Sequence, residues 1–177
     1  MNQKIVVADD FYDIAYQYHK GFIDNECVIT EETTDKISQI LHSPVKVIEA
    51  FNEVTFENTQ NQITANLQAD WIAVIYLTLP PECVFKKGLS FYIHKKTNLD
   101  AFPNDYAMEL YGWKTMEDLQ KSFDVSNAND WEEYMNIFVK YNRLVLFNAD
   151  LWHSYGSGFG EELNTSMIYQ KILLKNA

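Results

Sequence analysis

Near the start of the chain, a strand-like apolar run is followed by apolar residues at helical spacing. Residues 4–8 (KIVVA) predict a short strand. The apolar residues between 11 and 18 recur at helical spacing, so we predict a helix that Asp9 or Asp10 caps and that ends near residue 22. A second helix is predicted over 33–42, where Thr33 or Thr34 precedes the sequence DKISQILH.

The middle of the chain is dominated by strand patterns. The clearest is WIAVIYLTL at 71–79, whose unbroken apolar run predicts a strand covered on both faces and ended by Pro80-Pro81. Residues 46–57 predict a strand pair or one bent strand. Shorter β-like patterns occupy 63–67 and 88–96.

The last third of the chain contains a helical insertion, predicted over 104–123, and then returns to strands at 131–139 and 142–148. Residues 148–162 are rich in Gly and Ser and predict a loop. Residues 165–175 alternate in character, as a strand with one covered face does. This order predicts an α+β, mainly β, sheet sandwich or barrel rather than a doubly wound fold. We expect a single domain over 1–177.

Composition agrees with one β-rich domain that has a sizeable core. Hydrophobic residues make up 47% of the 177 residues and aromatic residues 15%. No apolar run reaches the roughly 18 residues that a membrane helix needs, so we expect no membrane partner. The net charge of −11 repels phosphate backbones, which argues against nucleic acid as a partner.

Two further features bear on the cell compartment and the source. Cys27 and Cys83 form no CxxC pair and the start of the chain lacks a signal-peptide pattern, so we expect a cytoplasmic protein with reduced thiols. Arg143 is the sole arginine among fourteen basic residues. That bias is typical of AT-rich genomes and suits a phage or a small-genome bacterium; a phage protein would be virion-associated.

Three ordered segments carry a resemblance to a known superfamily. They are ITANLQADWIAVIYLTLPPE, GLSFYIHKKTNLDAFP and YNRLVLFNADLWHSYGSGFG followed by a strand. Together, over residues 45–175, they resemble an uncharacterised branch of the 2-oxoglutarate/Fe(II)-dependent dioxygenases. The resemblance implies a double-stranded β-helix core of the jelly-roll, cupin-like kind, with N-terminal helices and one helical insertion.

In that superfamily an HxD motif and a distal His hold the metal. The His and the Asp of the motif can reach the same metal because residues i and i+2 of a strand project to one side. The aligned positions here are Thr64 and Asn66, with His153 as the distal His. Thr64 and Asn66 offer neutral oxygens in place of an imidazole and a carboxylate. The resemblance therefore implies that Thr64, Asn66 and His153 are relic positions. We expect no bound metal, no cofactor and no catalytic residue.

The cation that binds 2-oxoglutarate in the superfamily is also missing from its expected place. Leu163, Asn164 and Thr165 stand where an Arg or Lys is expected. Lys171 lies further along the last strand and does not match the expected spacing. The metal site and the cosubstrate site are therefore altered together.

Other residues are candidates for a site. His94 could join His153 and a carboxylate, Asp150 or Glu161, in a different metal site, although two unrelated hydrogen-bonded histidines are the favoured interpretation. Barrel mouths often hold ligands, and aromatic residues also fill cores. The candidates for lining a ligand pocket are Trp71, Tyr76, Phe91, His94 and Trp152.

These observations leave three hypotheses. The preferred one is an oxygenase-like fold that has lost Fe(II)/2-oxoglutarate chemistry and serves as a binding or structural and assembly protein with a protein partner. One version of this hypothesis is a phage-associated protein. The alternative is an active Fe(II)/2-oxoglutarate-dependent hydroxylase with non-standard ligands, which would need both cofactors. The third is a metal-free binder of small ligands.

Overall fold

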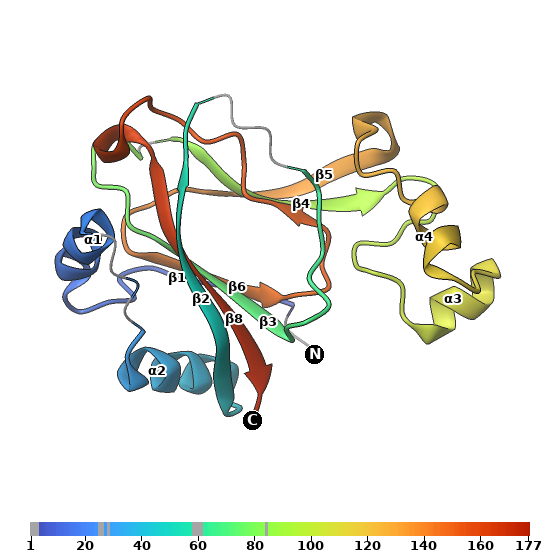
Figure 1. The fold of residues 1–177 in the computed structure, drawn as a ribbon, viewed down its shortest axis with the longest axis horizontal. Helices are drawn as coiled ribbons and strands as arrows, with labels where there is room; N and C mark the ends of the chain where they lie inside the picture. The colour runs from blue at the N-terminus through green and yellow to red at the C-terminus, as the bar shows by residue number, and fades with distance from the viewer. Residues whose placement is uncertain (1–3, 25–26, 28, 58–61, 84) are drawn as a thin grey trace.

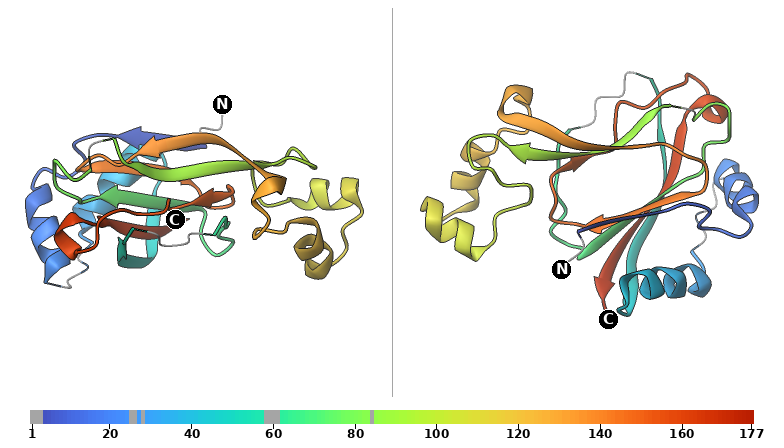
Figure 2. Two further views of the ribbon diagram at one scale, coloured as in Figure 1. Left: turned by 90° about the horizontal axis from the view of Figure 1, so that it is seen from above. Right: turned by 180° about the vertical axis from the view of Figure 1, so that it is seen from behind.

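The computed structural model describes residues 4–24, 27, 29–57, 62–83 and 85–177. Two antiparallel sheets face each other, two helices cover the outer side of the larger sheet, and a helical insertion projects from one end (Figures 1 and 2). This arrangement confirms the mainly β, jelly-roll-like architecture that the sequence predicts.

The larger sheet has five strands in the order β1-β6-β3-β8-β2, and every neighbouring pair is antiparallel. The central strand β3 is the apolar run of the sequence, and both its faces are covered as that run predicts. The five strands are β1 (Ile5–Ala8), β6 (Arg143–Asn148), β3 (Trp71–Tyr76), β8 (Met167–Asn176) and β2 (Val45–Thr55).

The smaller sheet has three strands in the order β5-β4-β7. They are β5 (Trp131–Phe138), β4 (Lys87–His94) and the two-residue β7 (His153–Ser154). Strand β7 pairs with β4 through the partners Phe91–His153 and Ser90–Ser154. The chain segment that carries the candidate metal ligand is therefore part of the smaller sheet.

Four α-helices of the described part of the chain lie outside the sheets. Helices α1 (Ala15–Ile23) and α2 (Glu31–Leu41) bury apolar residues against the outer face of the five-stranded sheet (Figure 1). Helices α3 (Asp105–Tyr111) and α4 (Met116–Ser122) form the insertion, and each begins with a side chain that caps it. Two short 3₁₀ turns occupy Ala128–Asp130 and Leu163–Thr165.

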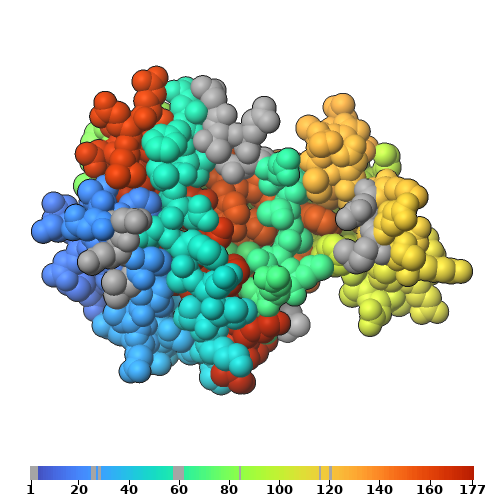
Figure 3. All heavy atoms as spheres, in the orientation of Figure 1, coloured from blue at the N-terminus to red at the C-terminus, as the bar shows by residue number. Residues whose placement is uncertain are grey.

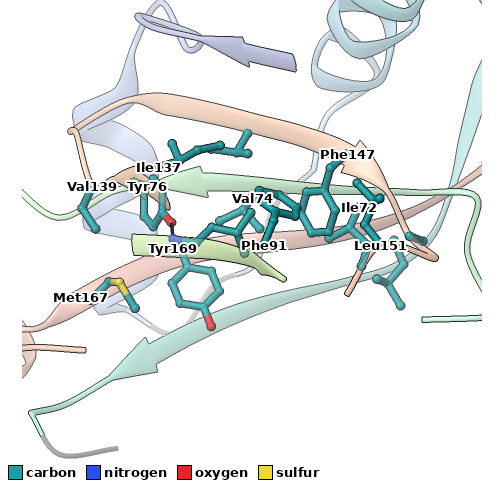
Figure 4. Close-up of a cluster of buried hydrophobic side chains, with 14 of the residues drawn as sticks. Ile72, Val74, Tyr76, Phe91, Ile137, Val139, Phe147, Leu151, Met167 and Tyr169 are labelled. Carbon is teal, nitrogen blue, oxygen red and sulfur yellow. Dashed lines mark hydrogen bonds between the residues drawn. The ribbon is translucent and has the colours of Figure 1, made fainter. Parts of the chain in front are cut away.

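The main core lies between the two sheets (Figure 4). Phe91 of β4 meets Phe147 of β6 edge-on, with ring centroids 5.1 Å apart. The buried hydroxyl of Tyr76 accepts a hydrogen bond from the backbone N–H of Leu89 at 2.8 Å, which ties β3 to β4. Aromatic residues thus join the facing sheets by both packing and hydrogen bonding.

The first helix begins later than the sequence predicts. It starts at Ala15, and Ile14 at its N-cap makes no side-chain cap. Neither of the expected caps, Asp9 and Asp10, lies at its start. Asp9 instead binds Arg143 at 2.6 Å and Lys140 at 2.7 Å, so its carboxylate is committed to another part of the fold. The second helix begins two residues earlier than predicted, with Thr30 as its cap.

Three strand predictions also change. The stretch predicted over 46–57 forms the single strand β2, Val45–Thr55, with a bulge between Val47 and Glu49, which confirms the bent-strand alternative. In the β-like stretch 63–67, Thr64 makes only an isolated bridge. The predicted loop 148–162 contains strand β7. Among the described residues, no helix has the length and apolar character needed to cross a bilayer.

Candidate functional site

The backbone brings the first and last of the three candidate metal positions together. Thr64 and His153 form an antiparallel bridge in which each N–H donates to the other's carbonyl at 2.9 Å. Nearby, the N–H of Asn66 donates to the carbonyl of Ala149 at 2.7 Å. The segment at 64–66 therefore lies beside the distal His segment, as the resemblance implies.

The side chains of Thr64 and Asn66 make hydrogen bonds within their own loop. The amide oxygen of Asn66 accepts hydrogen bonds from the backbone N–H groups of Gln68 at 2.8 Å and Ala69 at 3.0 Å. This arrangement is a side-chain turn that an Asn or Asp commonly makes. Thr64 is exposed, and its hydroxyl approaches the carbonyl of Ala65 at 3.4 Å. Neither side chain contacts His153 through a hydrogen bond.

His153 is buried, and both its ring nitrogens have partners. Nδ1 lies 2.7 Å from the carbonyl oxygen of Leu151, so this nitrogen carries the proton and donates it. Nε2 lies 3.3 Å from the hydroxyl of Tyr155 and accepts from it. Burial lowers the pKa of His153 to about 4, against the opposing effect of the Leu151 carbonyl. The ring is therefore neutral at physiological pH.

Aromatic rings surround His153. Phe147 meets its ring edge-on at a centroid distance of 4.8 Å. Tyr155 does the same at 5.3 Å and stacks on Tyr169 at 5.5 Å, with an interplanar angle of 11°. These side chains pack into the space beside Nε2.

A basic residue does face the interior on the last strand. Lys171 pairs with Val74 of the main core across β3 and β8, so its side chain lies on the inner face of the sheet. Its Nζ lies 2.7 Å from a carboxylate oxygen of Glu53 and 4.9 Å from the ring centroid of Phe51. The sequence interpretation set Lys171 aside because of its spacing. Strand alternation was the signal that could have found it, because residues 167, 169, 171 and 173 share one face.

His94 occupies a separate aromatic cluster next to the insertion. Its Nδ1 lies 2.9 Å from the Thr97 hydroxyl, and its ring packs on Phe123 and Trp131 at centroid distances of 4.6 and 5.0 Å. Burial lowers its pKa, although the nearby charge of Asp130 opposes that shift. Its Nε2 is buried, with no hydrogen-bond partner within the part of the chain that the structure describes.

The five pocket candidates do not share one cavity. Tyr76 and Phe91 are buried in the main core, whereas Trp152 and the adjacent His94 belong to the cluster beside the insertion. Trp71 packs on the helix-covered side of the larger sheet and lines a surface groove. As ligand contacts, all five stay a prediction.

No group of three or more His, Cys, Asp and Glu side chains able to hold a metal ion occurs among the described residues. His94 and His153 lie in different clusters, so the alternative site that combines them with Asp150 or Glu161 is not assembled in this structure. The interior side chains at the candidate site are therefore His153, Tyr155, Lys171 and Glu53.

Solved structures supply the comparison, since neither protein-family models nor curated protein sequences match the chain. Iron-bound HygX from Streptomyces hygroscopicus is 12% identical, with a TM-score of 0.53 over 98% of this chain and 83% of HygX. The α-ketoglutarate-dependent non-heme epimerase SnoN from nogalamycin biosynthesis is 9% identical, with a TM-score of 0.52 over 98% and 79%. The chain has their fold.

HygX has also been crystallised with nickel and 2-oxoglutarate, at 9% identity and a TM-score of 0.53. Because α-ketoglutarate is another name for 2-oxoglutarate, HygX and SnoN are both linked to this compound. At 9–12% identity the likeness extends to the fold alone. What this chain does must follow from its own residues.

Proposed function

We propose that this chain is a binding protein built on the Fe(II)/2-oxoglutarate oxygenase fold, and that it does not perform the oxygenase reaction. The observation that carries the proposal is the state of His153. Its Nδ1 donates to Leu151 and its Nε2 accepts from Tyr155, so a metal could bind Nε2 only after the Tyr155 hydroxyl had moved.

The donor set supports the same conclusion. A non-heme Fe(II) site of this fold uses two imidazoles and one carboxylate. Here one imidazole remains, and the other two positions carry a hydroxyl that is exposed and an amide oxygen that already accepts two backbone hydrogen bonds. These residues do not fit Fe(II).

The candidate cation for the acid group of 2-oxoglutarate already has a partner within the chain. Lys171 is the basic residue that faces the interior on the last strand, and Glu53 neutralises it at 2.7 Å. An incoming carboxylate would have to displace Glu53 and lie between the rings of Phe51 and Tyr155 that flank the ammonium group.

Metal content and ligand-induced stabilisation test the proposal together. The protein is purified anaerobically in excess Fe(II), desalted and analysed for bound metal, with HygX as the positive control because iron is bound in its crystal structure. We expect substoichiometric iron and no rise in Tm with 2-oxoglutarate. Stoichiometric iron together with a 2-oxoglutarate-dependent rise in Tm would overturn the proposal.

The second candidate is an active Fe(II)/2-oxoglutarate-dependent hydroxylase with non-standard ligands. The retained His153 and the interior position of Lys171 favour it. It requires conversion of 2-oxoglutarate to succinate in the presence of Fe(II), ascorbate and O₂. Its cofactors would be those found in the HygX structures. A protein partner and a virion-associated role stay predictions from the sequence.

A further inference from the structure

A surface groove of about 720 Å³ lies on the helix-covered side of the larger sheet, away from the barrel interior. Its lining residues come from the C-terminal end of α2, the start of β3 and the ends of β6 and β8. These element ends lie in the lower half of the view in Figure 1, where the dark red C-terminal residues are also visible in Figure 3. His153 and Lys171 do not line it. Of the three candidate metal positions, Asn66 lines the groove and Thr64 does not, so the groove lies next to the loop at 64–66 but apart from His153.

Amide groups without internal partners line the groove. The side chains of Asn148 and Asn176 lie at the ends of β6 and β8, the two strands that flank β3, and make no hydrogen bond to any described residue. The amide nitrogen of Asn66 makes none either. Each amide can donate and accept at once. Such a wall suits a ligand with several hydroxyl groups.

The electrostatics of the groove favour a positive ligand. Among its charged residues, Asp70 forms an ion pair with Lys175 at 3.3 Å and accepts a hydrogen bond from the backbone N–H of Asn176 at 2.9 Å. Asp150 has no ion pair with any described residue, and Lys4, whose charge acts on Asp150, is itself paired with Asp100 at 2.8 Å. One carboxylate of the groove thus lacks a counter-charge.

Two neighbouring features add to this preference. The eleven-residue helix α2 ends at the groove, and the C-terminal end of a helix carries partial negative charge that attracts cations. The half-buried indole of Trp71 forms part of the wall, and an indole face binds both cations and flat apolar surfaces. No Lys or Arg lines the groove.

We propose that this groove binds a small hydroxylated amine, with Asp150 pairing to its ammonium group and the asparagine amides contacting its hydroxyls. The volume, the unpartnered amides and the unneutralised carboxylate carry the assignment. A cluster of acidic residues alone would favour a metal ion, but the groove offers one free carboxylate beside amides and an indole.

Calorimetric titration with glucosamine tests the assignment, with glucose as the probe that lacks the charge and methylamine as the probe that lacks the hydroxyls. We expect saturable binding of glucosamine and about tenfold weaker binding of either control, since each control loses charged or multiple hydrogen bonds. Equal binding of glucose would overturn the role of the charge, and no binding of glucosamine would overturn the whole proposal.

Variants locate the binding. Asp150→Asn keeps the size and exposure of the side chain, and we expect it to weaken glucosamine binding about tenfold and to leave glucose unaffected. Glu132→Gln, on the exposed edge strand β5, is the matched control and should bind as the parent does. If both variants bind glucosamine like the parent, the amine is bound elsewhere. Iron content plays no part in these tests, so they can fail or succeed independently of the proposed loss of metal.

Discussion

Thr64 and His153 lie directly opposite each other, and each donates its backbone N–H to the other's carbonyl at 2.9 Å. Directly paired residues on antiparallel strands project their side chains to the same face. The side chains of Thr64 and His153 therefore project to one face, while each makes its hydrogen bonds with other partners.

That relationship predicts that metal binding can be introduced by substitution. In the double variant Thr64→His with Asn66→Asp, an imidazole would stand opposite His153 and a carboxylate would replace the amide. We expect the variant to bind Co(II) or Ni(II) measurably, with affinity below that of a native site because Tyr155 still occupies Nε2. Visible absorption of the Co(II) form and calorimetry report the binding.

Adding Tyr155→Phe to that double variant isolates the effect of the hydroxyl. The ring and its stacking on Tyr169 are kept, while the donor to Nε2 is removed. We expect tighter Co(II) binding than in the double variant. The single Tyr155→Phe variant is the control and should bind no metal. No metal bound by a well-folded triple variant would contradict retention of the site geometry.

Glu53 is predicted to stabilise the fold by neutralising Lys171. The Lys171 side chain is 21% exposed, and in Glu53→Gln its ammonium group keeps only a neutral partner. We expect unfolding in urea to show a loss of about 1 kcal/mol, because partial exposure limits the effect of the lost charge. Glu117→Gln removes the carboxylate of an exposed pair with Lys121 and should cost less than about 0.5 kcal/mol. Equal losses would show that Lys171 is solvated.

The fold was largely predictable because its strands carry strong local signals. The unbroken apolar run at 71–76 gave the buried central strand, and alternation gave β8. Strand β7 was missed because its two polar residues have no pattern of their own; its existence depends on pairing with β4, over sixty residues earlier in the chain, and with Thr64. Asp9 was misassigned because its true partners are about 130 residues away.

The position of the candidate site was predictable from the sequence, whereas the hydrogen bonds and ion pairs of its side chains were not. The resemblance located Thr64 opposite His153, since backbone pairing follows from the fold. The hydrogen bonds of the His153 ring depend on side-chain rotation within the packed core, which local sequence does not determine. The inward direction of Lys171 was available from strand alternation, whereas its pairing with Glu53 required the register between β2 and β8.

The hydroxyl of Tyr76 is predicted to contribute more to stability than its size suggests. It accepts the backbone N–H of Leu89 at 2.8 Å in the fully buried core (Figure 4). Tyr76→Phe leaves that N–H unpaired, so we expect a loss of about 1–3 kcal/mol in urea unfolding. Tyr106→Phe, at a position 73% exposed, is the matched control and should be neutral. A neutral Tyr76→Phe would indicate that the Leu89 N–H finds another acceptor.

The buried, neutral ring of His153 is expected to make the free energy of unfolding decrease as the pH falls from 6.5 to 4. Its folded pKa of about 4 lies below the ordinary value of 6.5, so the unfolded state takes up the proton first as pH falls. The contribution of the neutral ring is therefore complete above pH 6.5 and is lost progressively between pH 6.5 and pH 4. The shift of about 2.5 pH units corresponds to a loss of about 3 kcal/mol across that window.

Urea unfolding of the parent and of His153→Gln between pH 4 and pH 8 measures this contribution. The variant is expected to be less stable at pH 8, because Gln packs poorly in a site shaped for a ring, and to lose less stability than the parent on acidification. His42→Asn is the control, since Asn tolerates the left-handed backbone there and His42 is exposed. It should follow the parent profile. If His153→Gln loses as much stability between pH 6.5 and pH 4 as the parent does, the acid sensitivity belongs to other groups, of which the buried His94 would be the first to test.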